Sequence, residues 1–249
     1  MENVLITGMS GLIGRALRTR LEGRYALSAL NRSDVEGVRC HRADISDLAA
    51  IRPAFAGQDV VVHLAAHVEV PGTIENMIAY NVLGTYNVFE AAREAGVKRV
   101  VYASSGAAIA AWEKEEPYAT LAKGVAPAGD AWPMLTHESP VRPNGLYGCS
   151  KVWGEALARH YTDTSDLSVI CLRIGRVHGE DKPLGPRDQA VWCSQRDIAS
   201  LLEACMAAPP SLKFDVVFGV SNNKLNYRDL EHTLEAVGWT PEDSVEDFA

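Results

Sequence analysis

A tyrosine and a lysine, Tyr147 and Lys151, stand four residues apart in the sequence. At the start of a helix this spacing places both side chains on one face, about one turn apart. A phenol titrates near pH ~10 in water, and a neighbouring ammonium is expected to lower that pKa towards the working range of a general base. Ser104 and Ser105 follow an apolar run and can offer a hydroxyl to the reacting oxygen. We therefore predict an acid–base centre whose catalytic side chains are Ser105, Tyr147 and Lys151.

A glycine-rich turn stands near the N-terminus, Gly8-Met9-Ser10-Gly11-Leu12-Ile13-Gly14, between a short apolar run and an amphipathic one. Its G-x-x-G-x-x-G spacing suits a tight turn that approaches a pyrophosphate at the N-terminus of a helix, where free N–H groups and the helix dipole face the anion. Glycines that serve only the turn would give the same letters. The strand-turn-helix context favours a site for NAD or NADP that involves Gly8, Ser10, Gly11, Leu12, Ile13 and Gly14.

The end of the second expected strand, Leu30-Asn31-Arg32-Ser33, bears on the choice of cofactor. An acidic residue at this point accepts a hydrogen bond from the 2'-hydroxyl of NAD, whereas neutral or basic residues admit the 2'-phosphate of NADP. Because Asn31 is neutral and Arg32 is cationic, we expect both to contact the cofactor and NADP to be accepted at least as well as NAD. Two alternatives stay open, with Arg32 as a solvated turn residue and Asp34 as the ribose contact.

Short apolar runs alternate with helical patterns through the first two thirds of the chain. The expected strands cover residues 3–7, 26–30, 38–42, 60–64, 99–103 and 168–172, and the expected helices cover 13–21, 48–55, 73–95 and a segment that begins near Tyr147. Uninterrupted Val, Ile and Leu runs between helices are typical of a parallel sheet covered on both faces. The predicted fold class is α/β, a doubly wound parallel sheet of the Rossmann type.

The carboxyl ends of the strands in such a sheet form the crevice where a dinucleotide lies. This extends the predicted cofactor site to the residues that follow the later strands, which are Asp44, Ile45, Leu64, Ala65, Ala66 and Ser104. Considered one at a time, these positions have simpler interpretations. Asp44 can be a helix cap, and the alanines can be packing residues.

Two parts of the chain depart from the alternation. Residues 104–145 contain five prolines and several glycines, which makes them too long and irregular for a simple connection, so we expect a substrate-facing loop. After residue 174 the alternation fades. We therefore expect residues 1–174 to form the dinucleotide-binding core and residues 175–249 to form a small substrate-binding part.

The composition excludes several classes of function. The 32 acidic residues against 24 lysines and arginines give a formal charge of -8, which disfavours nucleic-acid binding. No apolar run approaches the ~20 residues that cross a bilayer, and the N-terminus lacks a positive leader segment. The five cysteines are odd in number without C-x-x-C spacing, so reduced thiols are favoured over disulfides or a metal site. These features predict a cytoplasmic protein that binds a small molecule and has neither a metal, a membrane nor a nucleic acid as partner.

Taken together, the motifs resemble the extended short-chain dehydrogenase/reductase family, also called the NAD-dependent epimerase/dehydratase family. The resemblance covers essentially the whole chain, through residues 8–14, 60–66, 81–87, 101–105, 147–151 and 172–173. It implies that Tyr147 is the general base or acid, that Lys151 binds the nicotinamide ribose and lowers the pKa of Tyr147, and that Ser105 orients the substrate oxygen. It also adds Asn81 and Ile174 to the cofactor contacts, and it implies a homodimer that pairs through the helices at about 73–95 and 147–161.

The C-terminal part is similar to the uronate dehydrogenases of that family, which oxidise a hexuronic acid at its anomeric carbon to an aldarolactone. Arg187, Trp192-Cys193-Ser194, residues 217–223 and residues 241–244 carry this likeness. By resemblance, the planar guanidinium of Arg187 grips the substrate carboxylate through two hydrogen bonds.

Two departures from the uronate dehydrogenases fall on the expected substrate side. The chain has Gly106-Ala107 after Ser104-Ser105, where those enzymes carry Asn-His, and it has His67-Val68-Glu69 where they carry a substrate-facing serine. The expected substrate contacts are His67, Ser105, Gly106 and Arg187.

The predicted function is hydride transfer between NAD(P) and a small sugar or sugar acid, such as a hexuronate, with Tyr147 as the acid or base. A nucleotide-sugar epimerase or reductase of the same family is one alternative, although few residues follow position 174 to hold a sugar diphosphate. A non-catalytic NAD(P)-sensing protein is another. The presence of Ser105, Tyr147 and Lys151 argues against a sensor, because loss of the tyrosine or lysine would be its simplest signature.

Overall fold

The computed structural model describes residues 1–68, 73–129 and 131–248. Its centre is a seven-stranded sheet in the order β3-β2-β1-β4-β5-β6-β7, in which every neighbouring pair is parallel. The strands are β1 (Asn3–Thr7), β2 (Ala26–Asn31), β3 (Arg39–Arg42), β4 (Val60–His63), β5 (Arg99–Ser105), β6 (Ser168–Ile174) and β7 (Phe214–Gly219). The strand order reverses between β1 and β4, which is the switch point where sheets of this kind bind ligands. The predicted doubly wound fold is confirmed.

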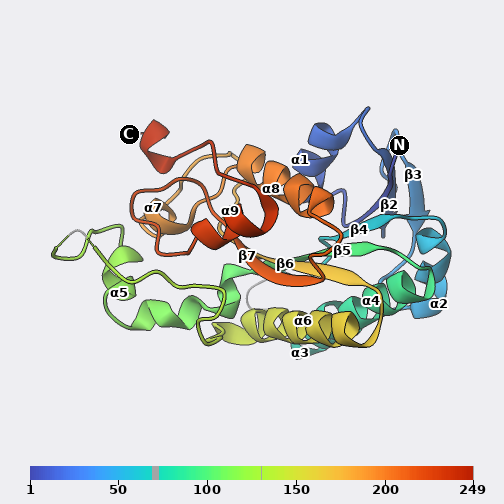
Figure 1. Ribbon diagram of the computed structural model, residues 1–249, viewed down its shortest axis with the longest axis horizontal. Helices are drawn as coiled ribbons and strands as arrows, with labels where there is room; N and C mark the ends of the chain where they lie inside the picture. The colour runs from blue at the N-terminus through green and yellow to red at the C-terminus, as the bar shows by residue number, and fades with distance from the viewer. Residues whose placement is uncertain (69–72, 130, 249) are drawn as a thin grey trace.

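Helices cover both faces of this sheet (Figure 1). On one face lie α1 (Leu12–Leu21), α8 (Gln195–Ala207) and α9 (Glu231–Val237), and on the other lie α2 (Leu48–Ile51), α4 (Gly84–Glu94) and α6 (Gly145–Thr164). Because successive side chains of a strand point to opposite faces, β1 serves two cores. Val4 and Ile6 pack in the cluster of α1 and α8, whereas Leu5 packs in the cluster of α4 and α6.

The helix expected at 73–95 is present as three consecutive pieces, α3 (Ile74–Asn76), the π-helical η2 (Met77–Leu83) and α4. Residues 104–145 contain more helical structure than the predicted loop. They contain the short helices η3 (Gly106–Ala108), η4 (Ala110–Lys114) and α5 (Tyr118–Leu121). The remaining short helices are η1 (Arg52–Phe55), α7 (Asp188–Val191) and η5 (Val245–Phe248). None of the helices in the described residues is long and apolar enough to cross a membrane.

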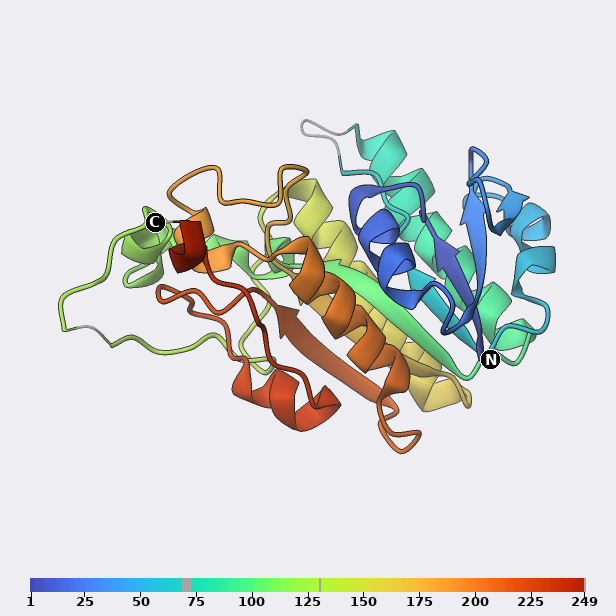
Figure 2. The same ribbon diagram turned by 90° about the horizontal axis from the view of Figure 1, so that it is seen from above.

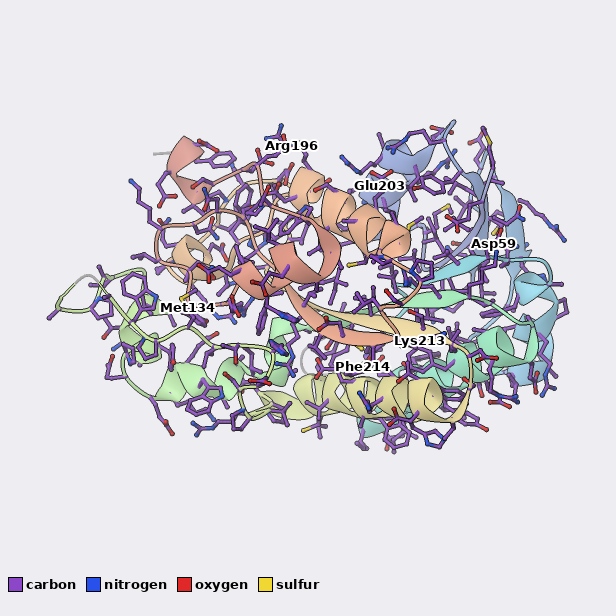
Figure 3. All side chains as sticks on the ribbon, in the orientation of Figure 1. Asp59, Met134, Arg196, Glu203, Lys213 and Phe214 are labelled. Carbon is purple, nitrogen blue, oxygen red and sulfur yellow. The ribbon has the colours of Figure 1, made fainter. Side chains whose placement is uncertain are left out.

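Residues after position 174 also contribute to the sheet and its cover, because β7 is the outermost strand and α8 packs on the same face as α1. Figure 2 shows α8 running alongside α1. Arg20 of α1 and Arg24, which follows that helix, form ion pairs with Glu203 of α8, which is labelled in Figure 3. The expectation that residues 175–249 bind substrate stays a prediction.

A third apolar cluster lies between residues 104–145 and the C-terminal part. It includes Ile109, Tyr118, Leu135 and Tyr227, and the Leu135 N–H donates to the Tyr227 carbonyl. In Figure 3, Met134 of this segment lies on the left, away from Lys213 and Phe214, where β7 begins. The segment therefore covers the carboxyl ends of β5, β6 and β7, where an α/β sheet binds its substrate.

Candidate active site

The glycine-rich turn between β1 and α1 has a backbone that only glycine can supply. Gly8 has φ of +73°, and a Cβ on it would lie 2.9 Å from the Ala65 backbone nitrogen. A Cβ on Gly14 would lie 2.6 Å from the Gly8 carbonyl oxygen. The first turn of α1 has Gly11 as its N-cap, with no side-chain hydrogen bond to the cap. Its N–H groups are therefore left for a ligand, as an anion site at a helix N-terminus requires.

Two crevices meet at this turn. The first contains predicted cofactor residues at or just after the carboxyl ends of β1, β2, β3 and β4, together with the expected substrate residue His67. These cofactor residues are Ser10, Asn31, Arg32, Asp44, Ile45 and Ala65. The second contains Leu12, Ile13, Gly14, Ser104, Ser105, Tyr147, Lys151 and Ile174. Gly8, Gly11, Leu64 and Ala66 line both. One continuous channel thus joins the glycine turn to the predicted acid–base centre.

The residues of this channel fit a nicotinamide dinucleotide. Three of the four residues shared by the two crevices are glycine or alanine, namely Gly8, Gly11 and Ala66, so a pyrophosphate can approach the backbone. In the first crevice the Asn31 amide donates to the Ser10 hydroxyl at 2.7 Å, while its buried Oδ1 has no hydrogen-bond partner among the described residues. A buried acceptor without a donor is costly, and a ribose hydroxyl would satisfy it.

Two arginines and two aspartates lie at the rim of the first crevice. The Arg32 guanidinium lies 5.3 Å from the centre of the Tyr80 ring, and Arg32, Arg42 and Asp44 together line an adjoining hollow. Asp34 forms an exposed ion pair with Arg42 at 3.5 Å. Asp44 caps its own turn by accepting from the backbone N–H and hydroxyl of Ser46.

The acid–base residues come from β5 and α6. Ser105 ends β5, and Tyr147 and Lys151 lie in the first turns of α6, so the predicted trio lines one crevice. Lys151 is buried, and its Nζ donates to the Ala103 carbonyl at 2.7 Å and lies 5.5 Å from the centre of the Tyr147 ring.

The electrostatics of this pair differ from the expectation that Lys151 lowers the pKa of Tyr147. Burial raises the pKa of Tyr147 to about 12, against a hydrogen bond with Ser105 that lowers it. Burial also lowers the pKa of Lys151 to about 8, against the nearby charge of Glu155. In the protein alone, desolvation by burial is the largest cause of both shifts. The expected lowering of the Tyr147 pKa is therefore wrong for this state.

Glu155 links α6 to β5 and β6, and the sequence analysis did not predict this role. Its Oε1 accepts from the Ser104 hydroxyl at 2.6 Å and from Arg173 Nε at 2.9 Å, and its Oε2 accepts from Arg173 Nη2 at 2.8 Å. The group joins β5, α6 and β6 behind Lys151. Its position one helical turn after Lys151 was the signal that could have found it.

Asn81 lies in η2 outside the two crevices. Its Oδ1 accepts from the His67 backbone N–H at 2.7 Å, and its Nδ2 donates to the His67 carbonyl at 2.9 Å and to the Ser150 hydroxyl at 3.1 Å. Asn81 thus braces the chain that leaves β4, and its contact with the cofactor stays a prediction.

Of the expected substrate contacts, Gly106 and Arg187 belong to a cluster beside the second crevice. Arg187 donates from Nε and Nη2 to the two oxygens of Glu113, each at 2.7 Å, and the Tyr227 hydroxyl donates to the same carboxylate at 2.5 Å. Gly106 is buried against the Arg228 guanidinium. Glu113, Tyr227 and Arg228 were not predicted, because none stands in a motif.

A larger hollow, of about 880 Å³, lies at the amino ends of the strands, and its lining includes Lys98, Ser168 and Lys213. Figure 3 labels Lys213 there. The glycine turn and the Tyr147–Lys151 pair lie at the carboxyl ends of the strands, so the channel is the better candidate for the active site.

Residues 4–200 match the profile of the "NAD dependent epimerase/dehydratase family". The chain belongs to this family. Among curated members, the chain is 35% identical to uronate dehydrogenase from Agrobacterium fabrum, across 100% of the chain and 87% of the relative. It is 31% identical to NAD-dependent glucose-6-phosphate dehydrogenase from Haloferax volcanii, across 98% and 95%. It is 32% identical to L-arabinose 1-dehydrogenase (NAD(P)(+)) from the same organism, across 98% and 98%.

The family assignment extends to three dimensions. The crystal structure of uronate dehydrogenase from Agrobacterium tumefaciens matches with a TM-score of 0.83 at 34% identity, covering 100% of the chain and 87% of that structure. A mutant of that enzyme has been solved with NAD. This epimerase/dehydratase family member is accordingly an NAD(P)-dependent oxidoreductase, and the resemblance found in its sequence is confirmed.

Proposed function

We propose that this family member transfers a hydride between NAD(P) and a small sugar or sugar acid, such as a hexuronate. The supporting observation is that Ser105, Tyr147 and Lys151 share one channel with the glycine turn. Relatives that span nearly the whole chain are named for uronate, glucose 6-phosphate and arabinose, which are small substrates without a nucleotide. The short C-terminal part suits a substrate of that size.

In this proposal each side chain of the channel has a separate task. The glycine turn and the first turn of α1 hold the pyrophosphate, and Asn31 faces the adenosine ribose. NAD(P), when bound, supplies the carbon that accepts or donates the hydride. Ser105 hydrogen-bonds the substrate oxygen, and Tyr147 takes the proton from that oxygen during oxidation or returns it during reduction. Lys151, whose Nζ donates to the Ala103 carbonyl, lies one helical turn after Tyr147 on α6.

The test is a substrate screen with the wild-type protein. Glucuronate, galacturonate, glucose, glucose 6-phosphate, arabinose and UDP-glucose are each incubated with NAD+ or NADP+, and reduced cofactor is followed by absorbance. We expect reduction with at least one sugar that carries no nucleotide. Epimerisation of UDP-glucose without net cofactor reduction would establish the epimerase alternative instead, and cofactor binding without turnover of any sugar would favour the sensor.

The role of Tyr147 is tested by Tyr147→Phe, which removes only the hydroxyl. We expect kcat to fall by a factor of about 10³ while the Kd of the cofactor changes little, because general acid–base groups contribute on the order of 10²–10⁴ to rate. Tyr25→Phe, at the amino end of β2 and away from the channel, is the matched control and is expected to keep wild-type kcat. Retention of more than about a tenth of kcat in Tyr147→Phe would remove the tyrosine from the proton transfer.

A homodimer and a cytoplasmic location remain proposals. The helices that resemblance assigns to the dimer interface expose large apolar side chains, namely Ile74, Ile78, Leu83 and Tyr86 on one and Leu146 and Trp153 on the other. Such a group of apolar side chains is typical of a protein–protein interface. Light scattering should show a dimer for the wild type and a monomer for Ile78→Glu/Trp153→Glu. A wild-type monomer at micromolar concentration would contradict the dimer.

A further inference from the structure

Arg228 is a buried cation whose hydrogen-bond donors are only partly satisfied by the described residues. Its side chain is 1% exposed, and neither Nε nor Nη1 has a hydrogen-bond partner among the described residues. A guanidinium carries five N–H donors, and leaving them unsatisfied away from water costs free energy. Burial accordingly lowers its pKa, although a guanidinium stays protonated at neutral pH. A cation in this state is expected to have an acceptor supplied from outside the chain.

The guanidinium lies next to the catalytic serine. A Cβ built on Gly106, the residue after Ser105, would stand 2.7 Å from Arg228 Cζ and 2.8 Å from Nη1. Every other residue type at position 106 would therefore displace the guanidinium. The glycine therefore leaves the place next to Ser105, a residue of the second crevice, to the Arg228 guanidinium.

The neighbouring charges do not neutralise Arg228. Glu113 is the carboxylate that lowers the net charge of this cluster, and its oxygens accept from Arg187 and from the Tyr227 hydroxyl. Arg187 holds the pKa of Glu113 below its usual range, so this carboxylate is ionised. Two guanidiniums and one carboxylate leave one positive charge, and Arg228 is the cation whose Nε and Nη1 have no acceptor among the described residues.

We propose that Arg228, and not Arg187, binds an anionic group of the substrate, a carboxylate or a phosphate, at the end of the sugar remote from the reacting carbon. Arg187 already holds an internal carboxylate, so its donors serve Glu113. An acidic group that reaches Arg228 beside Gly106 accepts charge-assisted hydrogen bonds from the guanidinium. These bonds satisfy the N–H donors of Nε and Nη1 that have no partner among the described residues. This inference rests on the proposed function and adds the charge of the substrate to it.

The test compares three sugars that share one ring and differ at the sixth carbon, namely glucose, glucuronate and glucose 6-phosphate. We expect wild-type kcat/KM to be at least about tenfold higher for one of the two acids than for glucose. In Arg228→Gln, kcat/KM for that acid should fall about 30-fold, the loss expected for a charged hydrogen bond, while kcat/KM for glucose changes less than about threefold. The two acids separate a carboxylate from a phosphate site.

The matched control is the double variant Glu113→Gln/Arg187→Gln, which removes both charges of the internal pair together and leaves no buried ion alone. It should keep the preference for the acid. Loss of the preference in this variant and its survival in Arg228→Gln would place the anion on Arg187 and overturn the inference. An equal loss for all three sugars in Arg228→Gln would also overturn it, since that is the result of a purely structural arginine.

Arg228→Lys keeps the positive charge, and it tests the proposal even if the Arg228→Gln variant does not fold. It should lose about three- to tenfold in kcat/KM on the acid, because one ammonium replaces the planar fork, and an unchanged value would count against the assignment. A wild type that oxidises glucose better than both acids contradicts the anion site and leaves the dehydrogenase proposal intact. A wild type that reduces neither cofactor with any sugar contradicts the proposed function, and the inference with it.

Discussion

Lys151 Nζ lies 5.5 Å from the centre of the Tyr147 ring and donates to the Ala103 carbonyl at 2.7 Å. The two predicted acid–base groups thus share a crevice, and the ammonium donates a hydrogen bond to the main chain of β5. Burial then dominates both titrations, raising the pKa of Tyr147 to about 12 and lowering that of Lys151 to about 8. Each shift disfavours the charged form of its group.

The pH dependence of oxidation should follow Tyr147. Because burial raises the pKa of its phenol to about 12, the ionised form increases with each pH unit above neutrality, and kcat/KM for oxidation should rise between about pH 7 and 9. The Ser105 hydroxyl lowers this pKa, so Ser105→Ala should move the rising limb to higher pH as well as slowing turnover. A pH–rate profile of both proteins checks this. An unmoved limb in Ser105→Ala would refute the coupling of the two hydroxyls.

Lys151→Met should stabilise the protein at neutral pH while removing activity. Burial lowers the pKa of Lys151 from 10.5 to about 8, so the unfolded state binds more protons between these values. Stability therefore rises with pH from about 8 to 10.5, and the full cost of the buried charge is present below about 8. After allowance for the lost bond to Ala103, we expect Lys151→Met to gain about 2 kcal/mol at pH 7.

Urea unfolding at pH 7 and at pH 10 measures this difference. The gain in the free energy of unfolding should shrink at the higher pH, where the wild-type lysine is largely neutral. A methionine variant less stable than wild type at pH 7 would show that the buried ammonium is compensated within the fold.

His63 should make the protein sensitive to acid. Burial lowers its pKa from 6.5 to about 3, and its Nδ1 lies 2.8 Å from the Thr7 hydroxyl. The unfolded chain binds the proton more readily, so stability is lost as pH falls from about 6.5 towards 3, by about 3 kcal/mol at pH 4. His63→Gln should be less stable at pH 7 yet show a flatter decline in acid. His160→Gln, exposed on α6, should keep the wild-type slope in the same urea titrations.

The choice of cofactor should depend on Asn31. The neutral amide and the nearby Arg32 and Arg42 leave room for a 2'-phosphate, so the wild type should use NADP+ at least as well as NAD+. Asn31→Asp should reduce kcat/KM for NADP+ by about tenfold or more, because a carboxylate repels the phosphate, while NAD+ is retained. Michaelis constants for both cofactors decide the matter. A large wild-type preference for NAD+ would contradict this interpretation.

Local patterns were sufficient to predict the parts of this protein whose chemistry depends on neighbours in the chain. The glycine turn, the Tyr147–Lys151 spacing and the apolar strands lie within short windows, and backbone geometry places them as predicted. The same logic applied to Glu155 would have placed it on the face of α6 that carries Lys151. Asn81 shows where such reasoning stops, because its partners are the backbone of His67 and the hydroxyl of Ser150, reached through folding.

The sequence by itself determined the fold and the family and predicted the residues of the cofactor site, since periodicity and turn chemistry depend on residues close together in the chain. Only the tertiary structure decided how the charges around Arg187 and Arg228 are arranged. Glu113 meets Arg187 across 74 positions of the chain, and Arg228 packs on the glycine that follows Ser105. Burial, which sets the pKa values of Tyr147 and Lys151, is likewise a property of the packed molecule, because desolvation depends on every segment that closes over a group.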